Sequence, residues 1–237
     1  MVQLERVERH SPDVVTFYLA WDGRPLRFRP GQFVHVALDP YDPAGYWPES
    51  RAFSIASAPS DRHGMRLTIT RQGRFTSRLL EEVEVGRTLW CKGPYGEFEV
   101  AAHDPAAPVV LVAGGTGITP FCAFMEEALL RPETVGAPVR LYYGAIEADL
   151  LIYSSLARQC ATLLPGFEAR FFAEEGPLAP AVTRGRLDIR RIADESKGNP
   201  NTRFYLSGPH SMINTFADYL LGERDWPRDR VLVDAWE

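Results

Sequence analysis

The sequence is poor in cysteine and histidine, with 3 and 5 of them among 237 residues. Cys91, Cys122 and Cys160 lie far apart, whereas an iron–sulfur cluster takes four thiolates at short spacings, so the sequence predicts no cluster. The histidines are equally scattered, and we predict no metal site. We interpret the cysteines as packing thiols of a reducing compartment and expect a cytoplasmic protein.

Long apolar runs and an excess of basic residues are also missing. We therefore expect neither a membrane span nor a signal peptide. The net charge of −5 argues against nucleic acid or an anionic membrane as a partner. With 45% apolar and 24% charged residues, the composition is typical of a folded soluble protein, and the length fits two small domains.

The first half of the chain consists of short runs in which apolar and polar residues alternate. These runs predict strands over 2–9, 14–20, 32–38, 51–57, 65–71 and about 88–92, a loop over 39–50 and a connecting turn over 93–98. Many short strands separated by turn residues are typical of an antiparallel barrel. A polar, proline-bearing break follows at 101–108, and we place a domain boundary between residues 104 and 105.

The second half alternates strands with helices, which is typical of a parallel sheet with helical crossovers. We expect strands at 109–112, 138–143, 167–173, 202–206 and 230–233, and helices at about 118–130, 150–164, 189–193 and 210–221. Ligands bind beyond the carboxyl ends of such strands. The segments 114–120, 143–147, 207–212 and 234–237 should therefore gather on one rim.

A glycine loop, Gly114-Gly115-Thr116-Gly117, connects the first of these strands to its helix. Glycines let the backbone approach a pyrophosphate closely, and the N–H groups at a helix start attract an anion. Pro120 stands where the common dinucleotide fingerprint has its third glycine. By itself the motif fits a nucleotide site or a plain strand–helix turn.

The segment Arg51-Ala52-Phe53-Ser54 carries three side chains suited to a ligand. An arginine can bind phosphate bidentately, a ring can stack on a flat heterocycle, and a hydroxyl can hydrogen-bond to it. We expect all three side chains on one side of the strand. The alternative is an ordinary strand with an exposed arginine and a buried phenylalanine.

A second candidate segment spans residues 71–80, where a glycine turn leads into a helix start. Thr76 fits an ordinary N-cap. Alternatively, the helix N–H groups together with Arg51, Arg71 and Arg74 form a pyrophosphate site.

The motifs of this sequence, in the order in which they occur, resemble those of the ferredoxin–NADP reductase superfamily. The resemblance covers nearly the whole chain. The pieces that carry the resemblance are Arg51–Ser54, Gly73 with Thr76, Gly93–Phe98, Val112–Pro120, Tyr143–Ala145 and Ser207–Pro209. The resemblance implies a flavin-binding antiparallel β-barrel followed by a nicotinamide-nucleotide α/β domain with a parallel sheet. It also implies FAD and either NADH or NADPH as cofactors.

The resemblance assigns residues to both cofactors. For the flavin it implies Arg51, Ala52, Phe53, Ser54, Arg71, Gly73, Arg74, Phe75 and Thr76, with Ser54 near the reactive N5. For the nicotinamide nucleotide it implies Gly115, Thr116, Gly117, Pro120, Tyr143, Gly144, Glu147, Ser207, Gly208, Pro209 and Met212.

Three features qualify the resemblance. Ser207 stands where many members carry cysteine, so we expect no thiol beside the nicotinamide. Trp236 resembles a tail residue that covers the flavin, with a frayed terminus as the alternative. Glu147 follows the second strand, where NADP-using members commonly place a basic residue. Its carboxylate would accept hydrogen bonds from a ribose diol and repel a 2′-phosphate, which favours NADH.

The resemblance implies a flavin-dependent NAD(P)H oxidoreductase that passes electrons to a separate acceptor. We see no attached four-cysteine ferredoxin domain, so the acceptor is expected to be a ferredoxin-like protein, a haem or oxygenase partner, or a small molecule. Two alternatives stay open. One is a reductase of free flavin or ferric iron on the same fold, and the other is a non-catalytic subunit that binds flavin or nucleotide.

Overall fold

The computed structural model describes residues 1–234. Its N-terminal part is a six-stranded antiparallel sheet in the order β4-β3-β6-β1-β2-β5. The strands are β1 (Val2–Arg9), β2 (Val14–Trp21), β3 (Phe33–Ala37), β4 (Ser50–Ser54), β5 (Gly64–Thr70) and β6 (Thr88–Tyr95). A bridge between Ile55 and Leu67 joins the β4 edge to the β5 edge, which closes the sheet. The predicted antiparallel barrel is thus confirmed.

Successive side chains of β5 point alternately into the barrel core and away from it. Met65, Leu67 and Ile69 are buried in the barrel core. The residues between them, Arg66, Thr68 and Thr70, lie on the opposite face, as the two-residue period of a strand requires. Helix α1 (Arg74–Glu82) follows this strand and buries an apolar stripe against the same core.

One prediction for the barrel needs correction, and a second is confirmed up to residue 49. The expected turn over 93–98 is partly wrong, because β6 continues to Tyr95 through the cis Gly93–Pro94 bond and pairs with Phe33. The expected loop over 39–50 contains no strand before Ser50, but it is anchored: the ring of Tyr41 lies 5.2 Å from Trp47 and 5.9 Å from Trp90 of β6. The loop therefore packs against β6 at Trp90.

The C-terminal part is a six-stranded parallel sheet in the order β10-β9-β8-β7-β11-β12, which confirms the predicted fold class. Its strands are β7 (Val109–Gly114), β8 (Val139–Glu147), β9 (Phe167–Glu175), β10 (Val182–Arg184), β11 (Arg203–Ser207) and β12 (Val231–Val233). The helices are α2 (Thr119–Leu130), α3 (Ser154–Leu163), α4 (Ile189–Glu195) and α5 (His210–Asp218). Sequence reasoning missed β10, which is too short to show a period.

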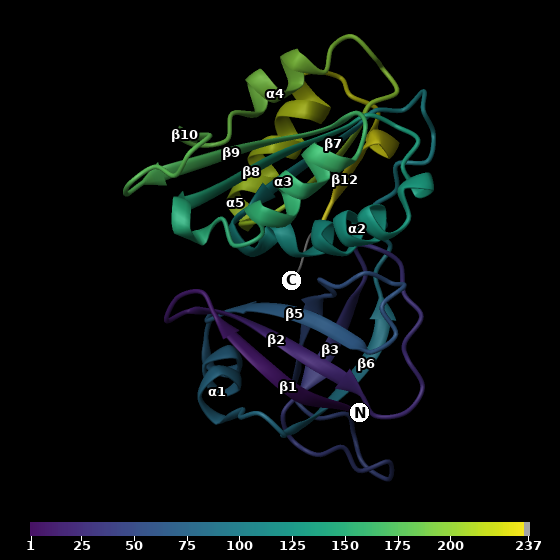
Figure 1. Cartoon of the computed structure of the whole chain (residues 1–237), viewed down its shortest axis with the longest axis vertical. Helices are drawn as coiled ribbons and strands as arrows, with labels where there is room; N and C mark the ends of the chain where they lie inside the picture. The colour runs from purple at the N-terminus through teal and green to yellow at the C-terminus, as the bar shows by residue number, and fades with distance from the viewer. Residues whose placement is uncertain (235–237) are drawn as a thin grey trace.

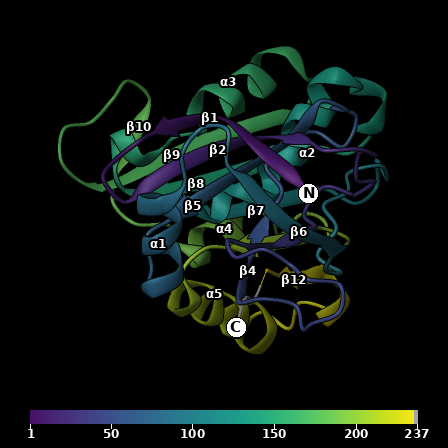
Figure 2. The same cartoon turned by 90° about the horizontal axis from the view of Figure 1, so that it is seen from below.

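Helices cover both faces of the parallel sheet. Alternate residues of β7 point to different cores: Leu111 packs with α2 and α3, whereas Val110 and Val112 pack with α4 and α5. Figure 1 shows the barrel and the parallel sheet as two stacked units, with α2 facing the barrel and α4 on the far side. The view from the barrel end shows β1, β2 and β5 overlying the α2 and α3 side (Figure 2).

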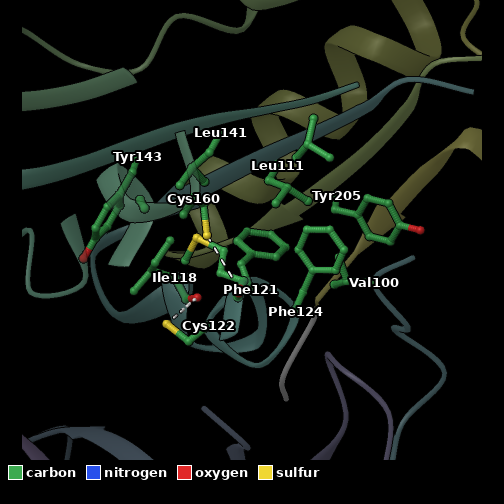
Figure 3. Packing of buried hydrophobic residues seen from close by; sticks show 14 of the residues in the cluster. Val100, Leu111, Ile118, Phe121, Cys122, Phe124, Leu141, Tyr143, Cys160 and Tyr205 are labelled. Carbon is green, nitrogen blue, oxygen red and sulfur yellow. Dashed lines mark hydrogen bonds between the residues drawn. The ribbon is translucent and has the colours of Figure 1, made fainter. Parts of the chain in front are cut away.

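The interpretation of the cysteines as packing thiols agrees with the structure. Cys122 and Cys160 lie in the core between the sheet and helices α2 and α3 (Figure 3). Burial raises the pKa of the Cys91 and Cys160 thiols to about 12 and that of Cys122 well above its ordinary value. All three thiols are unpaired and stay protonated at neutral pH.

The segment between β6 and β7 runs from the barrel into the second core. Phe98 packs 6.1 Å from the Phe121 ring and 5.6 Å from the Tyr205 ring, and Val100 and Ala102 join the same cluster. The predicted domain boundary between residues 104 and 105 stays a prediction. The linker residues before it already contribute to the core of the parallel-sheet unit.

Candidate active site

The loops after β7 and β11 meet at the carboxyl edge of the parallel sheet. A Cβ atom built on Gly117 would lie 2.5 Å from both the N and Cα atoms of Gly208. A Cβ on Gly114 would lie 2.8 Å from Pro209 Cδ and 2.9 Å from Met212 Sδ. Real Cβ contacts are essentially never this short, so only glycine permits the two loops to pack together.

Gly115 differs from these glycines because its surroundings are open. Its φ is +56°, and an added Cβ would meet no described atom within 4 Å. A short 3₁₀ turn, Gly115–Ile118, leads into α2, and its first turn holds no acidic residue and no side-chain cap. Pro120 lies in the first turn of α2. The exposed backbone and the helix start together suit an anionic ligand such as a pyrophosphate.

Ser207 lies at the carboxyl end of β11, but its hydroxyl is already engaged. The side chain is buried, and its Oγ donates to Oδ2 of the buried Asp234 at 2.9 Å. The Asp234 N–H also donates to the Leu206 carbonyl oxygen at 2.9 Å. Ser207 therefore anchors the chain after β12, leaving the Gly208 backbone at the loop surface. The predicted role of Trp236 falls outside the described residues.

The strand before the segment 143–147 was expected to end at about residue 143, and this end is wrong, because β8 continues to Glu147. The Tyr143 side chain is fully buried and donates to the Leu150 carbonyl oxygen at 3.3 Å. It belongs to the core, so only its backbone is near the strand end. Gly144 packs against Leu187, whereas Glu147 is exposed at the end of the strand.

The start of α1 forms the second half of the candidate site. Gly73 is the N-cap residue with a φ of +84°, and an added Cβ would meet no described atom within 4 Å. The first helical turn holds no acidic residue. The Arg51 guanidinium carbon lies 5.3 Å from the centre of the Phe75 ring, which places a cation of β4 next to this helix start. The pair suits a phosphate group.

Thr76 is not the N-cap that one interpretation predicted, since α1 begins at Arg74. Its hydroxyl accepts a hydrogen bond from the Gln72 N–H at 2.6 Å and so fixes the turn before the helix. Arg71 is held by carboxylates, with contacts of 3.1 Å to Asp13 and 2.6 Å to Glu81. Arg74 is exposed and makes no ion pair with the described residues.

The expectation that Arg51, Phe53 and Ser54 share one side of their strand is wrong. Arg51 and Phe53 pair with the buried residues Val36 and Val34 of β3, whereas Ser54 pairs with Phe33 on the other face. Arg51 and Phe53 are two residues apart and share a face of the strand. Ser54 comes one residue after Phe53, so the alternation of the strand puts it on the opposite face. Ala52 lies on the same face as Ser54. A ligand contacts both sets only at the strand edge, and β4 is an edge strand.

The two halves of the site meet along one face of β5. Arg66 Nη2 binds Glu126 Oε1 of α2, the Thr68 hydroxyl lies 2.6 Å from the Tyr153 hydroxyl before α3, and the Thr70 hydroxyl lies 2.9 Å from the Thr116 hydroxyl. We call these three pairs the interdomain seam. Burial, together with the nearby Cys122, raises the pKa of Tyr153 to about 12, so its hydroxyl stays protonated at neutral pH.

Apart from Thr116, the residues of the seam were not predicted from the sequence as functional residues. The signal was present in part, because Arg66, Thr68 and Thr70 alternate with apolar residues and so had to share one face of a strand. Nothing in the sequence indicated that this face meets the second domain instead of solvent. Asp234 was likewise assigned only to a tail, and its hydrogen bond with Ser207 was not foreseen.

The described residues 1–234 hold no group of three His, Cys, Asp or Glu side chains that could bind a metal ion. Within the same range, no helix is long and apolar enough to cross a membrane.

Comparison with known families decides the assignment. Residues 1–100 match the family described as "Oxidoreductase FAD-binding domain", and residues 111–218 match "Oxidoreductase NAD-binding domain". The chain belongs to the ferredoxin–NADP reductase superfamily. As in other members, FAD and a nicotinamide nucleotide are the cofactors, and the open glycines at both helix starts fit the phosphates of such ligands.

Relatives of this superfamily member cover nearly all of the chain. The flavohemoprotein of Pseudomonas putida is 39% identical over 228 residues, which are 93% of this chain and 55% of that protein. Ferredoxin–NADP reductase B of Sorangium cellulosum is 28% identical over 91% of this chain and 88% of its own length. The electron transfer component of a Burkholderia cepacia 2-halobenzoate 1,2-dioxygenase is 26% identical, and the chain spans 63% of its length. Most of these relatives are thus longer than this chain.

Solved structures agree on the fold. The FAD/NAD-binding domain of a nitric oxide dioxygenase from Vibrio cholerae superposes with a TM-score of 0.78 over 99% of this chain and 97% of that domain, at 21% identity. A ferredoxin–NADP reductase from Neisseria gonorrhoeae gives a TM-score of 0.74 at 18% identity over 98% of this chain. Both show that the barrel and the parallel sheet form a recurrent pair.

Proposed function

We propose that this chain takes electrons from NADH or NADPH into bound FAD and passes them to a separate acceptor. The observation that carries the proposal is the 2.9 Å contact between Thr70 and Thr116. Thr70 immediately precedes the segment that leads to the α1 start, and Thr116 belongs to the glycine loop of the parallel sheet. This contact supports the proposal because it joins the segments assigned to the two cofactors, and transfer between bound cofactors requires them to be close.

When bound, the flavin and the nicotinamide supply the redox chemistry. The protein residues bind and orient them. Arg51 and the α1 N–H groups would bind the flavin phosphate, and Phe53 would contact the ring system. The Gly115–Gly117 backbone binds the nucleotide pyrophosphate, and the Gly208 backbone flanks the same loop.

The names of the relatives support a separate acceptor. Members of the superfamily serve as reductase components of a propane monooxygenase and an alkene monooxygenase, and another forms part of a flavohemoprotein. We propose a ferredoxin-like, oxygenase or haem partner for this chain, with a small molecule as the alternative. A cytoplasmic location belongs to the same proposal, supported by the three unpaired thiols.

The test is a visible spectrum of the desalted protein, followed anaerobically after addition of NADH and then NADPH. We expect a flavin spectrum that bleaches. A colourless protein that oxidises NADH only with added flavin would instead support the free-flavin or ferric reductase. Retained flavin that neither nucleotide reduces would support the non-catalytic subunit.

Ser54→Ala is expected to lower the rate of flavin reduction by NADH about tenfold while FAD stays bound. Ser54 ends β4, is half-buried, and would hydrogen-bond to the flavin N5, and the loss of one such bond costs about 1 kcal/mol or more. Stopped-flow reduction measures the rate, and the flavin absorbance after desalting is the control. An unchanged rate would remove Ser54 from the mechanism.

Glu147→Arg is expected to shift the kcat/KM ratio toward NADPH by about tenfold, because an arginine can bind a 2′-phosphate that the carboxylate repels. The neighbouring cations are engaged: Arg186 pairs with Glu174 at 2.6 Å, and Arg158 donates to the Pro180 carbonyl oxygen at 3.0 Å. Steady-state kinetics with both nucleotides test this. Glu133→Arg on a distant exposed turn is the charge-matched control, and an equal shift in both variants would contradict the assignment.

A further inference from the structure

The last residue of β5 touches the nucleotide loop. The Thr70 hydroxyl lies 2.9 Å from the Thr116 hydroxyl, and both side chains are half-buried where the domains meet. We propose that Thr70 is a positioning residue: its hydroxyl sets the place of the Gly115–Ile118 turn, and hence of the nicotinamide nucleotide, relative to the flavin. This inference rests on the proposed function.

The barrel end of this contact is held by backbone hydrogen bonds. Thr70 pairs with Val14 in the β2–β5 ladder, and the next residue, Arg71, donates its N–H to the Asp13 carbonyl oxygen at 2.7 Å. Gly73, the N-cap of α1, follows three residues after Thr70. The strand end that contacts the nucleotide loop is therefore covalently continuous with the segment assigned to the flavin phosphates. A shift of one would move the other.

The loop end of the contact is held from three directions. The Thr116 carbonyl oxygen accepts hydrogen bonds from the N–H and the hydroxyl of Thr119, which fixes the turn to α2. Gly117 packs against the Gly208 backbone on the β11 side. Thr70 supplies the contact from the barrel. The first two contacts place the turn within its own domain, whereas the hydroxyl pair places it relative to the other domain.

A second contact of the seam serves as a control, because it joins the two domains without touching the nucleotide loop. Tyr153 and Thr68 form a hydroxyl pair of 2.6 Å on the same face of β5, two residues away from Thr70. Tyr153 directly precedes α3 and is no part of the nucleotide loop. Tyr153→Phe therefore removes an interdomain hydrogen bond of the same kind without touching the Gly115–Ile118 turn.

The experiment compares Thr70→Val, Thr70→Ser and Tyr153→Phe in the FAD-loaded chain. Valine keeps the shape of threonine and removes the hydroxyl, whereas serine keeps the hydroxyl. Losing one hydroxyl pair should let amide hydrogens of residues 115–118 exchange about fivefold faster in Thr70→Val, corresponding to one hydrogen bond. NAD⁺ affinity by calorimetry and the limiting rate of flavin reduction by NADH should fall several-fold. In Thr70→Ser, the loop exchange, the NAD⁺ affinity and the reduction rate should all match those of the unchanged protein.

Equal loop exchange in Thr70→Val and the unchanged protein would overturn the proposal. It would also be overturned if Tyr153→Phe accelerated exchange at 115–118 or slowed reduction as much as Thr70→Val. Failure of the proposed function has a different signature, because then neither nucleotide reduces the unchanged protein. Exchange at the loop would still decide the role of Thr70 in that case.

Discussion

Gly117→Ala is expected to raise the KM for the nicotinamide nucleotide about ten- to a hundredfold and to leave FAD bound. The new Cβ would lie 2.5 Å from the N and Cα atoms of Gly208, so one of the two loops must move away. Overpacking of this kind costs about 1–3 kcal/mol, and each 1.4 kcal/mol is a factor of ten in affinity. Steady-state kinetics and calorimetry with NAD⁺ measure the effect, and flavin absorbance reports the barrel.

Gly222→Ala is the matched control for this prediction. An added Cβ at Gly222 meets no described atom within 4 Å, and the residue lies in the Tyr219–Glu223 turn after α5, outside both loops. Its nucleotide kinetics should match those of the unchanged protein. If Gly117→Ala also kept an unchanged KM, the meeting point of the β7 and β11 loops would not be the nucleotide site.

Glu126→Met is expected to lower the free energy of unfolding by about 3 kcal/mol. The Glu126 carboxylate binds the Arg66 guanidinium and accepts the Ala58 N–H at 3.1 Å, and the two charged side chains are only 25% and 15% exposed. Removing one partner of a largely buried pair leaves the other charge uncompensated. Arg66 Nη2 also donates to the Ala56 carbonyl oxygen at 2.6 Å, but Arg66 makes no second ion pair with the described residues, so no other carboxylate balances its charge. Urea unfolding measures the change.

A double variant separates the charge from the packing. Arg66→Met together with Glu126→Met should recover most of the lost stability, because no buried charge is left unpaired. Glu133→Ala is the surface control: its pair with Arg131 is 3.3 Å long but both side chains are more than half exposed, and such pairs contribute about 0–1 kcal/mol. A Glu126→Met variant as stable as Glu133→Ala would show that the seam pair is screened by solvent.

Local pattern was sufficient for most of the secondary structure. Met65, Leu67 and Ile69 alternate with polar residues and form β5, and the apolar run before Gly114 forms β7. The predicted strand ends were wrong where the length of a strand depends on its partner strand, which the local residue pattern does not show. The backbone of β6 continues to Tyr95 because β3 offers it a partner there, and β8 continues to Glu147 because β9 pairs with it as far as Glu175. Pairing partners are not visible in one segment.

For the candidate site, too, some predictions from the sequence were right and others were wrong. The glycines at 73 and 115 were predicted to lie at helix starts, and both do, with positive φ and open surroundings. Ser54 was placed on the wrong face, an error that the two-residue period of a strand already contradicts. Ser207 was assigned to the nucleotide, yet its hydroxyl binds Asp234, which follows 27 residues later.

The sequence by itself determined the two-part fold, the glycine loop, the α1 start and the membership of a flavin and nucleotide reductase superfamily. These depend on residue spacing, which a chain keeps whatever it packs against. Only the tertiary structure decided that Arg66, Thr68 and Thr70 face Glu126, Tyr153 and Thr116. Partners 46 to 85 residues apart in the chain come together only when both cores have formed and one face of β5 lies against the second domain.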